Sequence, residues 1–265
     1  MPDTIRLTSH TVGDAGPRVM FLHGLFGQGK NWHTIALRLA ERGFQVTTVD
    51  LPNHGRSPWT DQQDYGEMAA LVAELLETLG DPVTLVGHSM GGKVAMRVAL
   101  RRPELLTALV VVDIAPMDYG GASSQFEEFI AGMQALDLQS LASRKDADEA
   151  LAEAVPDATV RGFLLQSLVR DGEGWRWRLN LAVLQQGLGG LGSFPPAPDG
   201  AVFDGPVLWI AGADSPYVQA EARPRMTELF PRTRLVRIKG AGHWVHSEQP
   251  GVFLAALNQF LDELS

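Results

Sequence analysis

A serine stands in the glycine-bounded pentapeptide Gly87-His88-Ser89-Met90-Gly91, between an apolar run typical of a buried strand and a helical pattern. At so sharp a strand-to-helix turn the serine must adopt strained backbone angles, and the glycines leave room for it. We therefore expect the hydroxyl at the C-terminal edge of a sheet, beside the positive end of the following helix. The pattern predicts that Ser89 is a nucleophile, and the alternative is a glycine-rich turn with a capping serine.

The histidines are the candidate bases, because a serine hydroxyl is a poor nucleophile at neutral pH. In a site of this kind the base comes last in the chain, on a loop after the final strand. His243 lies in such a loop, within GAGHW (240–244), and is the predicted base. His246 is interpreted as a supporting or capping residue of the helix that Pro250 continues. The other histidines near the motifs are expected to bind backbone carbonyls and to have no catalytic role: His23, His33, His54 and His88.

A carboxylate must also fix the tautomer of the imidazole and stabilise the imidazolium. Two aspartates compete for this role. Asp113 lies in the strand predicted over 107–114, and Asp214 follows the strand predicted over 206–212. Both are expected at the same sheet edge as the serine, so spacing alone leaves the choice open.

Acyl transfer further requires backbone amides that bind the tetrahedral oxyanion. The segment HGLFG (23–27) directly follows the first predicted parallel strand. Leu25 and Met90 are the expected donors, with Phe26 as an alternative because the sequence does not say which amide points inward. The side chains expected to contact substrate are those of His23, Phe26, His88 and Trp244.

The elements that must position these residues alternate between strand and helix, which predicts βαβ units and a parallel sheet. Strands are expected over 18–23, 44–50, 83–87, 107–114, 206–212 and 234–238. Helices are expected near 32–41, 68–79, 94–102, 220–230 and 253–264. The predicted fold class is α/β.

The strand pattern disappears between about Met117 and Gly205, where helical patterns and a loop rich in glycine and proline replace it. We interpret 117–205 as an inserted helical cap on a core formed by 1–116 and 206–265. Five apolar cap residues are candidates for an acyl pocket, although their helical spacing favours ordinary packing for most: Phe126, Phe129, Met133, Phe163 and Leu164.

Composition limits the partners. The net charge of -9 is spread along 265 residues, which argues against nucleic acid as a partner. There is no apolar run long enough for a membrane span, and Met1 to His10 lacks the pattern of a secretory signal, so we expect a cytoplasmic protein. The absence of cysteine and of HExxH spacing leads us to expect no metal and no other cofactor. A monomer or homodimer is expected.

Several motifs together resemble the α/β-hydrolase superfamily, and within it the YbfF-type esterase subfamily. They are HGLFG (23–27), DLPNHGRSP (50–58), GHSMGGKVAM (87–96), VVDIAP (111–116), WRWRLNL (175–181) and GAGHWVH (240–246). The resemblance implies a mostly parallel eight-stranded sheet with a helical cap. It also implies that the acid is the aspartate of VDIAP, which favours Asp113 over Asp214. In the wider superfamily the acid stands at the position of Ser215.

The combined expectation is a serine carboxylesterase that hydrolyses short to medium acyl esters through an acyl-enzyme intermediate. Its substrate would be a small-molecule ester, and the resemblance extends this to thioesters. The alternative is a perhydrolase or a carbon–carbon bond hydrolase that uses the same triad. A third possibility is a ligand-binding protein without catalysis.

Overall fold

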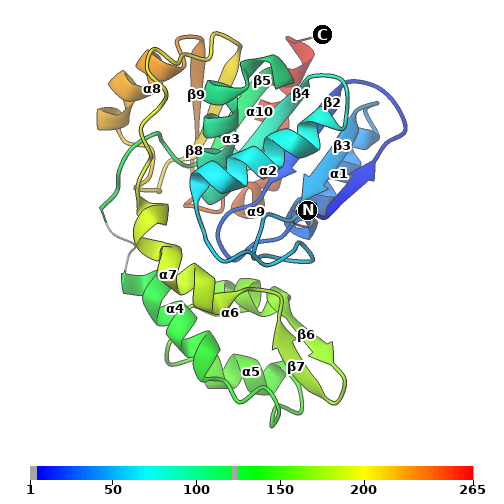
Figure 1. Ribbon diagram of the computed structural model, residues 1–265, viewed down its shortest axis with the longest axis vertical. Helices are drawn as coiled ribbons and strands as arrows, with labels where there is room; N and C mark the ends of the chain where they lie inside the picture. The colour runs from blue at the N-terminus through cyan, green and yellow to red at the C-terminus, as the bar shows by residue number, and fades with distance from the viewer. Residues whose placement is uncertain (1–4, 121–123, 265) are drawn as a thin grey trace.

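The computed structural model describes residues 5–120 and 124–264, and one twisted sheet forms its centre (Figure 1). The strand order is β1-β3-β2-β4-β5-β8-β9, with β1 antiparallel to its neighbour and the other pairs parallel. The strands are β1 (Ser9–Val12), β2 (Arg18–Leu22), β3 (Gln45–Val49), β4 (Val83–His88), β5 (Leu106–Val112), β8 (Val207–Gly212) and β9 (Thr233–Ile238). The predicted α/β fold class is confirmed.

The main sheet has seven strands in the part of the chain that the structure describes, whereas the resemblance implied eight. Thr8, just before β1, contacts the residue after β3 and the loop that follows it. The amide of Thr8 donates to the hydroxyl of Ser57 at 2.8 Å, and its carbonyl accepts from the amide of Asp50 at 2.9 Å. Among the described residues, β1 is the edge strand on this side of the sheet.

Strand register brings the loops of interest to one edge of the sheet. Leu22 pairs with Gly87, and His88 pairs with Val112, so β2, β4 and β5 end at nearly the same level. Because these strands are parallel, the loops that follow them meet at a single carboxyl edge.

Helices cover both faces of the sheet, so β4 and β5 are largely buried on both sides and are rich in valine and leucine. One face carries α2 (Tyr65–Glu77), α3 (Met90–Arg101) and α8 (Arg223–Leu229). The other carries α1 (His33–Ala40), α9 (Val245–Glu248) and α10 (Pro250–Asp262). The α2 helix begins earlier than its apolar periodicity indicates, because the carboxylate of Asp64 caps it by accepting from the amides of Gly66 and Glu67 at 2.7 and 3.0 Å.

The chain between β5 and β8 forms a lobe below the sheet in Figure 1. It contains α4 (Ser124–Ala135), α5 (Arg144–Leu151), α6 (Ala158–Leu164), β6 (Leu168–Asp171), β7 (Gly174–Trp177) and α7 (Leu181–Gly192), which share a hydrophobic cluster of their own. We call this segment the cap. The boundaries that the sequence indicates for the cap, at residues 117 and 205, remain a prediction.

The cap, which the sequence indicated as helical, also contains a two-stranded hairpin. The helical pattern in this part of the sequence ends at Leu164, and after a short turn the chain enters the β6–β7 hairpin. A two-residue turn at 172–173 closes this hairpin, and Gly172 adopts there a φ of 60° that suits glycine. Four-residue strands are too short for periodicity to separate them from a helix end.

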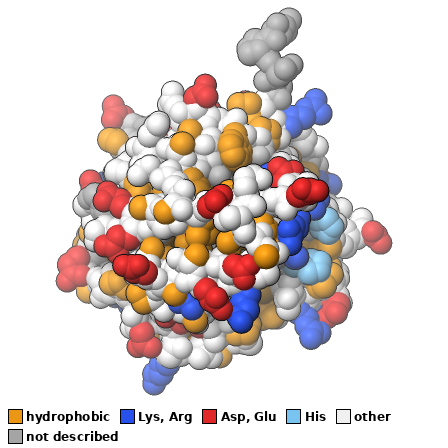
Figure 2. All heavy atoms as spheres, turned by 90° about the horizontal axis from the view of Figure 1, so that it is seen from below, with side chains coloured by type: hydrophobic (Ala, Val, Ile, Leu, Met, Phe, Trp, Pro, Cys, Tyr) orange, Lys and Arg blue, Asp and Glu red, His pale blue; other side chains and the backbone are white. Residues whose placement is uncertain are grey.

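The face seen from below carries acidic and basic side chains interspersed with hydrophobic ones (Figure 2). This distribution agrees with a net charge of -9 that is spread over the chain. Among the described residues, no helix is both long and apolar enough to cross a membrane.

The first prediction concerns the packing of α3 against β2. A Cβ added to Gly91 would lie 2.5 Å from the carbonyl oxygen of His23, a backbone atom that has little freedom to move. We expect Gly91→Ala to lower the free energy of unfolding by about 3 kcal/mol, the upper end of the usual cost of overpacking. Gly189→Ala is the matched control, because that helical glycine of the cap has open space around it, and alanine should add about 0.5–1 kcal/mol there. Urea unfolding of both variants measures the difference, and equal stabilities would contradict the packing described.

Candidate active site

Ser89 occupies the turn between β4 and α3 with φ 52° and ψ -117°. This strained conformation is held from both sides, because the Ser89 amide donates to the carbonyl of Val112 at 3.0 Å and its carbonyl accepts from the amide of Lys93 at 3.1 Å. A Cβ at Gly87 would lie 2.2 Å from the carbonyl oxygen of Gly91, so the turn requires glycine there. The hydroxyl therefore reaches past the sheet edge at the N-terminal end of α3, as the sequence predicted.

His243 lies opposite this hydroxyl, with its Nε2 3.0 Å from the Oγ of Ser89 and its Nδ1 2.8 Å from Oδ2 of Asp113. Two other side chains hold the histidine loop. The Glu248 carboxylate accepts from the amides on either side of His243 at 2.5 and 3.1 Å. The ring of His88 donates from Nε2 to the carbonyl of His243 at 2.8 Å.

Asp113 is fully buried at the end of β5 and adopts a φ of 51°. Its carboxylate accepts from the amide of Gly212 at 2.9 Å and from the hydroxyl of Ser215, in addition to His243. Since a carboxylate accepts, Nδ1 of His243 carries the proton and Nε2 is free to accept from Ser89. The competing Asp214 is exposed, and the aspartate that the structure brings to the imidazole is Asp113.

The loop 23–27 supplies the amides considered for the oxyanion. The amide of Phe26, the alternative oxyanion donor, already donates to Nε2 of His54 at 3.2 Å. The amides of Leu25 and Met90 donate to no other described residue. Both residues line a cavity together with Ser89, so the two expected donors are the ones left available.

Two buried histidines fix the backbone of this loop. His23 accepts at Nε2 from the amide of Leu51 at 2.9 Å and donates from Nδ1 to the following carbonyl at 2.8 Å. His54 accepts from Phe26 and donates from Nδ1 to the carbonyl of Pro52 at 2.8 Å. Burial lowers the pKa of His23 to about 4 and that of His54 to about 3, so both rings are neutral at pH 7.

The remaining histidines of the sequence analysis have other positions. His246 belongs to the short α9 helix, which is separate from α10, and its ring stacks on Trp32 with centroids 4.2 Å apart. It therefore supports the site by packing and does not cap the helix at Pro250. His33 is exposed at the start of α1, away from the nucleophile.

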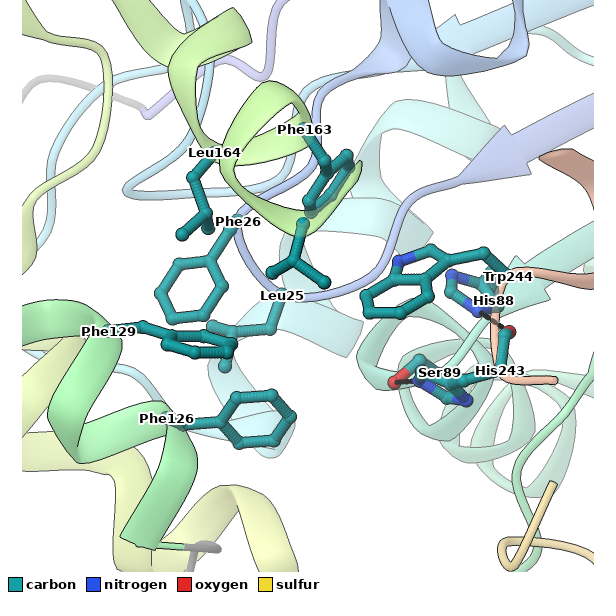
Figure 3. Close-up of a pocket in the computed structure, with 11 residues that line it drawn as sticks. Leu25, Phe26, His88, Ser89, Phe126, Phe129, Phe163, Leu164, His243 and Trp244 are labelled. Atoms are coloured by element: carbon teal, nitrogen blue, oxygen red, sulfur yellow. Dashed lines mark hydrogen bonds between the residues drawn. The ribbon is translucent and has the colours of Figure 1, made fainter. Parts of the chain in front are cut away.

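A small apolar cavity of about 20 Å³ opens beside the serine and the histidine (Figure 3). Its lining consists of Leu25, Phe26, His88, Ser89, Phe126, Phe129, Val160, Phe163, Leu164, His243 and Trp244. In Figure 3 the phenylalanines of the cap gather on the side opposite Ser89. Of the expected substrate contacts, Phe26, His88 and Trp244 belong to this lining, whereas His23 lines neither this cavity nor the next. Of the five apolar cap residues, Met133 is the exception and lies inside the cap cluster.

A second cavity, of about 300 Å³, begins on the other side of Ser89. It is lined by Leu25, Tyr65, Ser89, Met90, Lys93, Ile114, Tyr119, Phe126, Leu188, Leu191, Gly192, Pro216 and Tyr217. Apart from Ser89, the sequence analysis assigned no role to the polar side chains of this lining, those of Tyr65, Lys93, Tyr119 and Tyr217. They come from α2, α3 and the loops after β5 and β8, which only the folded chain brings together.

Sequence reasoning missed three further residues that hold the site. Ser215 stands where the wider superfamily carries its acid, and here it donates to Asp113. Asn53 has a φ of 64°, and its side-chain oxygen accepts from Asn180 of the cap at 3.0 Å. Glu248 holds the histidine loop as described above. The motif DLPNHGRSP contained the signal for Asn53, whereas Ser215 and Glu248 follow no pattern of their own.

Within the described ranges, no group of three or more histidine, aspartate or glutamate side chains is arranged to hold a metal ion. The arrangement suits proton transfer between a hydroxyl, an imidazole and a carboxylate.

Comparison with known proteins shows the family to which the chain belongs. A family model described as alpha/beta hydrolase fold matches residues 17–250, and the chain belongs to this family. The sn-1-specific diacylglycerol lipase ABHD11 of Mus musculus is 41% identical over 256 residues, which cover 94% of this chain and 82% of the relative. Esterase YbfF of Escherichia coli is 34% identical over 246 residues, which cover 92% and 93%.

A comparison with solved structures agrees with this family. A marine microorganism esterase superposes with a TM-score of 0.93 at 33% identity, covering 97% of this chain and all of that one. The resemblance to a YbfF-related α/β-hydrolase is thereby confirmed. These relatives are named as esterases and lipases, which supports a hydrolase.

The buried histidines generate a prediction about acid stability. The folded-state pKa values of His23 and His54 lie below the ordinary value of 6.5, so the unfolded chain binds more protons than the folded chain as pH falls. Their contribution to stability is complete above pH 6.5 and is lost as pH falls toward 4, by roughly 2 kcal/mol for each such ring at pH 5. We expect the free energy of urea unfolding to fall steeply between pH 7.5 and 5.0.

His54→Asn should reduce this pH dependence, because it removes one titrating ring. His33→Asn is the control and should leave the pH dependence unchanged, since that ring is exposed. A loss of stability in acid that is the same in both variants would show that the buried rings do not cause it.

Proposed function

We propose that this chain is a serine carboxylesterase that hydrolyses short to medium acyl esters through an acyl-enzyme intermediate. The observation that carries the proposal is the continuous chain of contacts from Ser89 through His243 to Asp113, at 3.0 and 2.8 Å. The names of the relatives, a diacylglycerol lipase and esterases, support the same reaction class. We keep the cytoplasm as the expected location.

In the first half of the proposed reaction, Oγ of Ser89 attacks the ester carbonyl carbon while Nε2 of His243 accepts the hydroxyl proton. The carbonyl oxygen becomes an oxyanion, which the amides of Leu25 and Met90 stabilise. Asp113 holds the ring in the productive tautomer and stabilises the imidazolium. His243 then returns the proton to the departing alcohol, and an ester of Ser89 remains.

In the second half, water attacks the acyl-enzyme while His243 takes its proton, and Ser89 leaves with that proton when the second tetrahedral intermediate collapses. The size of the larger cavity favours small acyl substrates. The larger cavity, about 300 Å³, lies at the lower end of the range for small-molecule sites, and its walls are mainly apolar. The aromatic side chains of the small cavity shield the catalytic atoms from bulk water.

The nucleophile is tested by pre-steady-state kinetics with an activated acetate ester. The wild type should release one equivalent of alcohol for each site in a burst, followed by slower turnover. Ser89→Ala should abolish the burst and reduce kcat/KM by about 10⁵- to 10⁶-fold. Ser140→Ala, at an exposed serine of the cap, should behave as the wild type. A burst that persists in Ser89→Ala would overturn the proposed function.

The acid is tested by two matched substitutions. Asp113→Asn should lower kcat by about 10³- to 10⁴-fold with little change in KM, because the amide favours the wrong tautomer of His243. Asp214→Asn should stay within about twofold of the wild type, as expected for an exposed surface residue without a part in the chemistry. Steady-state kinetics on the same activated ester compares them, and the reverse ranking would transfer the role to Asp214.

A further inference from the structure

The end of α7 is held by a lysine that the proposed mechanism does not use. Lys93 lies one helical turn after Ser89 on α3, and only 1% of it is exposed. Its Nζ donates to three successive carbonyl oxygens of the cap, those of Leu191, Gly192 and Ser193, at 3.2, 2.9 and 2.6 Å. One side chain of the nucleophile helix thus binds the last turn of α7.

The surroundings of the ammonium group account for this contact. No carboxylate among the described residues forms an ion pair with Lys93. The rings of Tyr65 and Tyr119 lie 5.6 and 4.9 Å from Nζ and favour a cation there. The C-terminal carbonyls of a helix carry partial negative charge, so they replace an acidic partner. Burial lowers the pKa of Lys93 to about 8, while Asp118 opposes the shift.

Lys93 also lines the larger cavity, and so does the part of α7 that it holds. Leu188, Leu191 and Gly192 form one wall of that cavity, and Ser89 lies in its lining. The hydroxyl of Tyr65 donates to the carbonyl of Leu191 at 2.9 Å and adds a second contact to the same turn. The position of this wall therefore depends on hydrogen bonds from the core.

The acyl group of an ester would enter this larger cavity. The departing alcohol must receive its proton from Nε2 of His243, and His243 lines the small cavity but not the larger one. The substituent on the other side of the carbonyl carbon then extends past Met90, along the wall that α7 provides. This assignment rests on the proposed function.

We propose that Lys93 is a positioning residue that sets the acyl-chain length accepted by the site, by fixing the end of α7 against the larger cavity. The ammonium group of Lys93 donates its hydrogen bonds to carbonyls of the cap, so Lys93 acts on the substrate through Leu188 and Leu191. With the lysine contact removed, this wall gains freedom, and the cavity no longer rejects chains that exceed its length.

The experiment measures kcat and KM for acetyl, hexanoyl and decanoyl esters of one activated alcohol. Lys93→Met keeps the length and apolar stem of the side chain but removes its donors. We expect the ratio of kcat/KM for hexanoyl over decanoyl to fall about tenfold, mainly through a lower KM for the decanoyl ester, which is the scale of discrimination in apolar pockets. Lys93→Arg should keep most of the wild-type ratio, because it restores donors to the same carbonyls.

Arg97→Met is the matched control. Arg97 lies one turn further along α3 and donates to the carbonyls of Pro195 and Pro196 at 3.2 Å, but it does not line the cavity. Its loss should lower stability and leave the chain-length ratio unchanged. A ratio that moves equally in both variants would assign the effect to general loosening of the cap and would overturn the proposal.

Burst titration with the acetyl ester separates the two levels of the argument. If the wild type gives no burst, the proposed function fails, whatever the ratios are. If Lys93→Met gives a full burst and an unchanged ratio, the role of Lys93 alone is refuted. Should Lys93→Met not fold, Lys93→Gln, which retains an uncharged donor, is compared with Arg97→Gln and should show the same fall in smaller measure.

Discussion

The backbone turn at Ser89 is the constraint on which the rest of the site depends. A residue with φ 52° and ψ -117° persists only where its surroundings determine its conformation more strongly than local preference opposes it. Here the neighbouring strand binds the Ser89 amide, and glycines at 87 and 91 allow backbone approaches that no side chain permits. Such strain costs about 1–3 kcal/mol for each residue, which the buried core beneath the turn must offset.

Similar strain recurs at the other functional positions. Phe26 and Asp113 also have positive φ, of 63° and 51°, and both belong to segments that face Ser89. Each is fixed by hydrogen bonds to neighbouring groups. The amide of Phe26 binds the neutral ring of His54, and the carboxylate of Asp113 accepts three hydrogen bonds. A pre-organised site of this kind does not have to reorient its dipoles when charge develops on the substrate.

Much of this site followed from the sequence, because a parallel sheet orders its loops along one edge. The glycine-bounded motif between strand and helix indicated Ser89 and chain order indicated His243, and the structure places Oγ of Ser89 3.0 Å from Nε2 of His243. The choice between Asp113 and Asp214 could not follow from spacing, since it depends on the direction in which each side chain leaves its strand. The resemblance favoured Asp113, and the structure places that carboxylate against His243.

Other features could not be predicted from the sequence, for a physical reason. The β6–β7 hairpin consists of strands of four residues each, which are too short for a period to be recognised. The contacts of Lys93 with residues 191–193 join positions about 100 apart in the chain, and nothing in the local sequence of either segment indicates the other. His23 was expected to contact substrate, but both of its ring nitrogens bind the backbone.

The distribution of contacts separates the proposed chemistry from the proposed selectivity. The hydrogen bonds around Ser89, His243 and Asp113 come from the sheet edge and its loops, whereas most aromatic walls of the small cavity come from the cap. Polar contacts also join the two parts, among them Asn53 with Asn180, Asn31 with Gln166 and Lys93 with the end of α7. Substitutions in the cap can therefore reshape the cavities while the triad geometry stays fixed. Lys93 is an exception to this separation, because it lies on the helix that begins at the nucleophile and yet holds a wall of the substrate cavity.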